Sequence, residues 1–260
     1  MSDEMIAGWA AEGVGTTRVS RLAGMLPGLY MIQTDDTGER RFFHWRESSA
    51  ARRLMDLPET GDILDSLSGY DLVYLSAITL SLYTETGGTR LIAALRSARE
   101  RGTRVAFDTN FRARGWPDLD VARAVYQDAF AAADIALAST EDLLPLYAGE
   151  SDDRLLARIV SPEVVLKLSE PASLVRFEGG VHQVKAEPVT KPVVDTTAAG
   201  DSFAAAYLAA RLARASPIDS DQAGHRLAGV VVCHPGAIIP ASAMPADIMS
   251  KQPISRRVSS

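Results

Sequence analysis

Short runs of β-branched and other apolar residues alternate with amphipathic segments along most of this chain, and that alternation limits the folds open to it. The apolar runs have the length of strands and span residues 71–76, 104–110, 133–139 and 163–169. Amphipathic segments lie between them at 89–102 and 120–133. Strands that alternate with helices at this spacing predict an α/β fold, in which helices cover both faces of a parallel sheet.

The segment 89–102 shows the helical pattern most clearly. Leu91, Ile92, Leu95 and Ala98 recur at the spacing that places side chains on one face of a helix. Gly102 follows where a C-terminal cap is expected, because glycine adopts the left-handed conformation without a steric penalty. We therefore predict a helix that buries these four side chains and ends just before Gly102.

One stretch departs from the alternation. Residues 28–47 contain two strand-like runs around Asp35-Asp36-Thr37-Gly38, a sequence typical of a hairpin turn. An antiparallel hairpin beside a parallel sheet predicts a small β-lid. At the other end of the chain, residues 246–260 are expected to form a disordered tail.

Charge and cysteine content exclude several classes of protein. The 260 residues carry a formal net charge of −6, which argues against a general binder of nucleic acid or of membrane surfaces. An anionic substrate must then be held by a few local cations. Cys233 is the only cysteine, so no disulfide can form within the chain. With no signal peptide and no apolar 18-residue run, we expect a cytoplasmic protein.

The segment DTTAAGDSF, residues 195–203, indicates chemistry. It follows the apolar pair Val193 and Val194 and precedes an alanine-rich run, as a strand-to-helix junction would. The N–H groups of residues 198–200 would lie uncovered in the first helical turn, where they and the helix dipole suit a phosphate. Asp201 beside that phosphate could act as a general base. The alternative, an aspartate that only stabilises the helix N-terminus after a threonine cap, is equally open on this stretch alone.

Several segments together resemble the ribokinase-like (PfkB) carbohydrate kinases. DTTAAGDSF resembles the family signature, with Ala198 at a position where glycine is commoner, and residues 28–47 resemble the family's lid. DTNFRARGW, VVLKLSEPASLV and HPGAIIP resemble its sugar-side loop, nucleotide strand and C-terminal loop. The resemblance implies a three-layer αβα sandwich with a mostly parallel central sheet and a small β-lid, formed by residues 1–245 as one kinase domain. Like the family, the chain has no Walker P-loop motif.

The resemblance is closest to family members that phosphorylate the sugar acid 2-keto-3-deoxygluconate, and it implies residue roles on the sugar side. Asp201 would activate the primary hydroxyl, and the backbone N–H groups of Ala198, Ala199, Gly200 and Asp201 would bind the transferring phosphoryl group. The implied sugar contacts are Tyr30, His44, Arg46, Asn110, Arg112 and Asp201. His44 stands where the family more often has tyrosine. An arginine suits a substrate carboxylate, because its guanidinium binds both carboxylate oxygens at once.

The resemblance also implies a nucleotide site for ATP and a place for Mg²⁺. The implied nucleotide contacts are Ser139, Lys167, Ser169, Ala198, Gly200 and His225, and Asp142 would position hydrated Mg²⁺. Residues 169–173, SEPAS, lack the glycines of the usual nucleotide loop.

Each of these side chains also has an ordinary structural explanation. Arg46 could be solvated at the surface, and Lys167 could simply end a strand. Tyr30 could pack, as aromatic residues in strands usually do. A lone histidine on a helix, such as His225, is commonly structural.

The family opens with a strand, a Gly-Gly motif and an Asn-bearing helix, whereas residues 1–17 resemble the helix that follows them. We therefore expect a sheet without its first strands and with unpaired edges. A misassigned start codon and a remnant of the kinase both explain this beginning. A kinase of fructose or a related sugar, and an inactive sugar- or nucleotide-binding remnant, stay open as alternative functions. The predicted partners are a sugar acid, ATP and a second copy bound through the lid.

Overall fold

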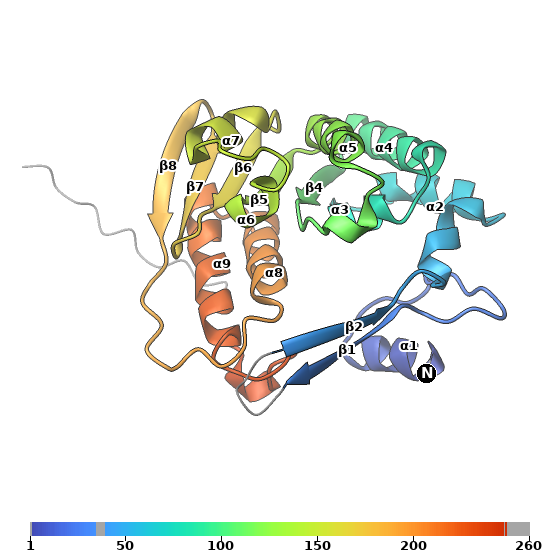
Figure 1. The fold of residues 1–260 in the computed structure, drawn as a ribbon, viewed down its shortest axis with the longest axis horizontal. Coiled ribbons are helices and arrows are strands. Elements are labelled where there is room, and N and C mark those ends of the chain that lie inside the picture. The colour runs from blue at the N-terminus through green and yellow to red at the C-terminus, as the bar shows by residue number, and fades with distance from the viewer. Residues whose placement is uncertain (1, 35–39, 247, 249–260) are drawn as a thin grey trace, which may run out of the picture.

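The centre of the molecule is a six-stranded sheet in the order β3-β4-β5-β6-β7-β8 (Figure 1). The structure is a computed structural model and describes residues 2–34, 40–246 and 248. β3 to β6 run parallel, and β7 and β8 add an antiparallel hairpin at one edge. The strands are β3 (Leu72–Ser76), β4 (Arg104–Asp108), β5 (Ile135–Ser139), β6 (Glu163–Lys167), β7 (Ala172–Phe177) and β8 (Gly180–Lys185).

Helices cover both faces of this sheet, so the predicted three-layer arrangement is confirmed (Figure 1). In β5, Ala136 and Ala138 pack into the core under α4 and α5, whereas Ile135 and Leu137 pack into a second core under α8. The helices are α1 (Ser2–Ala11), α2 (Thr60–Ser66), α3 (Ala77–Ser81), α4 (Glu85–Glu100), α5 (Leu119–Ala132), α6 (Thr140–Leu143), α7 (Asp152–Arg158), α8 (Ala199–Leu212) and α9 (Pro217–Val231). Short 3₁₀ turns lie at 50–56, 67–69, 113–115 and 241–243.

The predicted helix over 89–102 is α4, which begins four residues earlier, at Glu85. Thr84 caps it, because the threonine hydroxyl accepts a hydrogen bond from the Gly87 N–H at 3.4 Å. The four predicted apolar side chains are all buried. Gly102 follows the helix with φ of +100°, which confirms its role in ending the helix.

The predicted lid is a two-stranded antiparallel hairpin of β1 (Leu29–Thr34) and β2 (Arg40–Trp45). It lies apart from the six-stranded sheet and runs beneath it in the view of Figure 1, from the side of α2 toward the lower end of α9. The predicted turn at Asp35 to Gly38 lies outside the described residues. Large apolar side chains of the hairpin are exposed, among them Met31, Phe43 and Trp45.

The strand expected at Val193 and Val194 is absent, so that prediction is wrong. Both valines are 59% exposed, and the N–H groups of Val194 and Asp195 donate to the carbonyl of Val232 at the end of α9, at 2.8 and 3.1 Å. Pro188 and Pro192 precede them and lack the N–H groups that a sheet strand needs. The segment before α8 is therefore an extended loop held by α9.

At the C-terminal end, residues 247 and 249–260 lie outside the described part of the chain, so most of the predicted tail does too. The carbonyl of Ile248 accepts a hydrogen bond from Arg226 at 3.4 Å. Within the described residues, no helix has the length and apolarity needed to cross a membrane.

A partly buried ion pair fastens α8 to the far end of β6. Arg211 donates to both carboxylate oxygens of Glu163, at 2.9 and 2.7 Å, and the Tyr207 hydroxyl donates to the same carboxylate at 2.7 Å. The side chains of Arg211 and Glu163 are only 20% and 11% exposed. Because neither charge is well solvated, removing one partner leaves the other uncompensated.

Glu163→Gln should therefore lower the free energy of unfolding by about 2–4 kcal/mol, since Arg211 and Tyr207 lose a charged acceptor. Chemical denaturation followed by circular dichroism measures this change. Asp128→Asn is the control, because its partner Arg96 lies at the surface and that pair should contribute little. Equal losses in the two variants would contradict the importance of the Glu163 pair.

Candidate active site

The carboxyl ends of the parallel strands bring several predicted residues to one edge of the sheet. Register places Ser76 of β3 beside Asp108 of β4, and Ser139 of β5 beside Lys167 of β6. In α/β sheets this edge is where ligands usually bind. Residues that are far apart in the sequence, from 76 to 167, therefore line one potential site.

The first turn of α8 faces this edge with an unusual backbone. Its N-cap, Ala198, has φ of 60° and ψ of 13°, the left-handed conformation that favours glycine. An alanine there costs roughly 1–2 kcal/mol of backbone strain, so the surrounding contacts must hold it. Strain of this kind is typical of functional turns.

Asp195 supplies those contacts. One carboxylate oxygen accepts from the Thr197 N–H and hydroxyl at 2.8 and 2.7 Å, and the other accepts from the Gly236 N–H at 3.0 Å. The side chain thus ties the DTTAAGD turn to the HPGA loop after α9. The sequence alone did not indicate this role for Asp195, although an aspartate that bonds the N–H two residues on is a recognised turn signal.

Most of the predicted anion-binding N–H groups are free. Within the described residues, the N–H groups of Ala198, Gly200 and Asp201 have no hydrogen-bond acceptor. Ala199 is the exception, because its N–H donates to the Thr196 carbonyl at 3.3 Å. Three donors at the positive end of a 14-residue helix therefore suit an anion, and Ala199 contributes less than predicted.

The carboxylate of Asp201 is exposed and makes no hydrogen bond or ion pair with the described part of the chain. Its negative charge nevertheless interacts electrostatically with the Tyr74 hydroxyl on β3. Burial raises the pKa of the Tyr74 hydroxyl well above its usual value, and the charges of Asp108 and Asp201 raise it further. Asp201 therefore lies close to the carboxyl ends of the strands with its oxygens available to a ligand.

Asp108 is a second carboxylate at this edge, and it is 3% exposed. It accepts from the Tyr74 hydroxyl at 3.1 Å and from the Asn110 N–H at 3.2 Å. Burial raises the pKa of Asp108, although the charge of Lys167 opposes that rise. In the sequence, Asp108 falls within the strand-like run 104–110 and begins the DTNFRARGW segment, and neither pattern indicates a buried carboxylate.

The loop after β4 is held by Asp142. The Asp142 carboxylate accepts from the Thr109 hydroxyl and the Ser139 hydroxyl, both at 2.8 Å, and from the Phe111 N–H at 2.9 Å. Arg112 lies 3.7 Å from the same carboxylate and has a 60% exposed side chain. Predicted residues from the sugar side and from the nucleotide side thus meet around one carboxylate.

Next to Arg112, Asn110 has a buried side-chain carbonyl oxygen with no hydrogen-bond partner. An unsatisfied buried acceptor is costly, so this atom suits a ligand hydroxyl.

Direct metal binding by Asp142 does not fit this arrangement. Both of its oxygens already accept hydrogen bonds, and the described residues contain no group of three His, Cys, Asp or Glu side chains that could hold a metal ion. Mg²⁺ commonly keeps several waters and binds through substrate phosphates. The predicted contact between Asp142 and hydrated Mg²⁺ therefore stays a prediction.

The predicted nucleotide residues fall into two groups. Lys167 lies near the first turn of α8, because a Cβ atom built on Gly200 would be 3.7 Å from its Nζ. Ser169 follows the same strand, and its hydroxyl lies 3.2 Å from the Thr140 hydroxyl. His225 instead sits on α9 with its Nε2 2.8 Å from the Ser173 hydroxyl and 3.3 Å from the Asp221 carboxylate.

The lid brings Tyr30 together with Arg46. The guanidinium of Arg46 lies 5.3 Å from the centre of the Tyr30 ring, within the range of a cation–π contact. His44 is directly opposite Tyr30 in the strand register. The hairpin therefore presents an aromatic residue and a cation together, as the predicted sugar contacts require.

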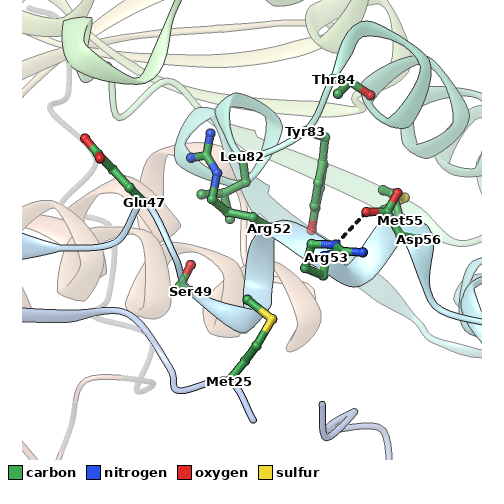
Figure 2. A pocket seen from close by; sticks show the side chains of 10 residues that line it. All are labelled: Met25, Glu47, Ser49, Arg52, Arg53, Met55, Asp56, Leu82, Tyr83 and Thr84. Atoms are coloured by element: carbon green, nitrogen blue, oxygen red, sulfur yellow. Dashed lines mark hydrogen bonds and ion pairs between the residues drawn. The ribbon is translucent and has the colours of Figure 1, made fainter. Parts of the chain in front are cut away.

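A cavity of about 330 Å³ lies at the base of the lid (Figure 2). Arg53 pairs with Asp56 on one wall at 2.8 Å, and the neighbouring Arg52 has no ion pair within the described residues. None of the predicted site residues lines this cavity. It is thus separate from the site at the start of α8.

Comparison with known proteins identifies the family. The model of the pfkB family carbohydrate kinases matches residues 1–244. The chain is 42% identical over 250 residues to 2-dehydro-3-deoxygluconokinase of Dickeya dadantii, and 39% identical over 250 residues to that of Escherichia coli K12. Each alignment covers 94% of this chain and 81% of the relative.

A solved structure of fructokinase with bound ATP from Xylella fastidiosa shares the fold, with a TM-score of 0.75 at 20% identity, over 95% of this chain and 80% of that one. The fold, the family model and the two bacterial relatives agree. This chain belongs to the pfkB family of carbohydrate kinases.

Proposed function

We propose that the protein transfers the γ-phosphoryl group of ATP to the primary hydroxyl of 2-keto-3-deoxygluconate, the sugar acid also called 2-dehydro-3-deoxygluconate. The observation that carries this proposal is the unbonded carboxylate of Asp201 beside the free N–H groups of Ala198, Gly200 and Asp201. The two bacterial relatives are named 2-dehydro-3-deoxygluconokinase, which supports this choice of substrate.

In the proposed reaction, Asp201 takes the proton of the primary hydroxyl as its oxygen attacks the γ-phosphorus. The new O–P bond forms, the bond to the β-phosphate oxygen breaks, and ADP leaves with that electron pair. The three N–H groups stabilise the charge on the transferring phosphoryl oxygens, and they need no reorganisation because the turn is already fixed. Lys167 adds a positive charge near the same turn.

On the sugar side, Arg46 and Arg112 are proposed to hold the substrate carboxylate, with Tyr30 and His44 beside it in the lid. Asn110 offers a buried, unpaired oxygen to a sugar hydroxyl. Two arginines favour an acid over a neutral sugar, because a guanidinium forms charge-assisted hydrogen bonds with a carboxylate. This argument favours the keto acid over fructose.

On the nucleotide side, Ser139, Lys167, Ser169 and His225 are proposed to surround ATP. Mg²⁺ would supply charge neutralisation at the phosphates. The location in the cytoplasm and the domain of residues 1–245 remain part of this proposal.

Binding of a second copy through the lid is proposed as well. The exposed Met31, Phe43 and Trp45 support it, since large apolar side chains grouped on one hairpin favour burial.

A substrate panel tests the central assignment. With MgATP, the protein should phosphorylate 2-keto-3-deoxygluconate with a kcat/KM at least about a hundredfold above those for fructose and ribose, because a charged carboxylate partner is worth about 1.5–3 kcal/mol per contact. Coupled detection of ADP measures the rates. Faster turnover of fructose would assign the protein to another sugar, and failure with every sugar would contradict the proposed activity.

Arg46→Ala should weaken binding of the keto acid by about 1.5–3 kcal/mol, the range for a lost charge-assisted hydrogen bond, and so raise its KM about 10- to 150-fold. Arg52→Ala is the matched control, because Arg52 is a nearby arginine without an ion pair that lines the separate cavity (Figure 2). Steady-state kinetics should show a changed KM in the first variant only. Equal KM values in wild type and Arg46→Ala would remove Arg46 from the site.

Asp201→Asn should lower kcat by about 10²–10⁴-fold, because asparagine keeps the shape but cannot accept the hydroxyl proton. Asp219→Asn is the matched control, since Asp219 lies in the first turn of α9 and should lose only about 0.3–1 kcal/mol of stability. Kinetics and thermal unfolding on the same preparations separate the two effects. Full activity with reduced stability in Asp201→Asn would show that Asp201 only caps the helix.

A further inference from the structure

Phe203 ends the DTTAAGDSF segment, and neither the anion site nor the base explains why a large ring stands there. Its side chain is 2% exposed and belongs to the core beneath α8. It lies two residues after Asp201, in the same first turns of the helix. Its surroundings therefore bear on the geometry of the active site.

α9 clamps the ring in place. A Cβ atom built on Gly224 would lie only 2.8 Å from two carbons of the Phe203 ring, so any larger residue at this position would displace the ring. The His225 ring meets Phe203 edge to face, with centroids 5.0 Å apart at an angle of 77°. His225 is in turn held by the Ser173 hydroxyl at 2.8 Å. The ring thus has little freedom to shift.

The cation of Lys167 lies over this clamped ring. Its Nζ is 5.6 Å from the ring centroid, and within the described residues it forms no ion pair or hydrogen bond. Its charge lowers the pKa values of Asp108 and Asp221, two carboxyls whose pKa values burial raises. The ammonium is bonded to neither acid, so another contact must fix its position. The ring face provides one, because its negative quadrupole attracts a cation.

We propose that Phe203 is a positioning residue, whose ring, clamped by Gly224 and His225, holds the Lys167 ammonium beside the first turn of α8. In that place the ammonium faces the anion site at Gly200 and adds its charge where the phosphates of the nucleotide are proposed to bind. This inference rests on the proposed function for its consequence, but not for the contact itself.

The contact is tested without any nucleotide. The sequence contains four lysines, Lys167, Lys185, Lys191 and Lys251, so lysine labelled with ¹³C at Cε gives few NMR signals. The Lys167 signal, assigned with Lys167→Arg, should be shifted upfield in the wild type by the ring current of Phe203. Phe203→Leu should remove that shift. An unchanged Lys167 signal in Phe203→Leu would overturn the proposal.

A second variant, Gly224→Ala, tests the same contact if Phe203→Leu does not fold. Gly224→Ala keeps the ring but displaces it, so the Lys167 signal should move. Gly229→Ala is the matched control on the same helix, because its Cβ would lie 3.5 Å from a Val189 methyl, an ordinary contact. The control should leave the signal in place. Equal shifts in the two glycine variants, or none in either, would contradict the clamp.

The consequence is tested by a double-mutant cycle on MgATP affinity, measured by calorimetry. Phe203→Leu should weaken binding about three- to tenfold in the presence of Lys167 and less than about twofold in the Lys167→Met background. If Phe203→Leu weakened MgATP binding by the same factor in both backgrounds, Phe203 would act by packing alone. If the wild type bound no MgATP, the proposed function would be refuted, whereas the NMR comparison would still decide the contact.

Discussion

The rest of the site depends on the hydrogen bonds that the Asp195 carboxylate accepts. Its hydrogen bonds to Thr197 and Gly236 hold the left-handed turn at Ala198, and that turn aims three free N–H groups outward from α8. Without this anchor, an alanine would leave the left-handed region, because its Cβ makes that conformation costly. The helix would then begin differently, and Asp201 would lose its place at the edge of the sheet.

Few charged side chains lie around this turn. Because the chain is acidic overall, the proposed anion site would depend on backbone N–H groups, one lysine and a few arginines. The buried Asp108 and the partly buried Asp142 accept hydrogen bonds from protein donors, whereas the Asp201 carboxylate accepts none among the described residues. The carboxylates that hold the loops in place therefore differ from Asp201, whose oxygens accept no protein donor there and which is proposed to take the proton.

The layers and the residues at strand ends were predictable, because apolar periodicity and parallel register depend on local sequence. The lid hairpin and α4, which ends before Gly102, were predicted from the same kind of local pattern. The strand at Val193 and Val194 did not form, since prolines remove donors and the end of α9 supplies an acceptor. The role of Asp195 depends on a loop 41 residues away, and no pattern within one sequence shows such a contact. The clamp on Phe203 likewise depends on how α8 packs on α9.

The most direct test of the central claim is a crystal structure of the protein with 2-keto-3-deoxygluconate and a non-hydrolysable ATP analogue. The account predicts the Asp201 carboxylate within about 2.6–3.2 Å of the primary hydroxyl of the sugar acid. It also predicts γ-phosphate oxygens that accept hydrogen bonds from the N–H groups of Ala198, Gly200 and Asp201. A substrate hydroxyl that instead contacts another base, with Asp201 turned to solvent, would contradict it.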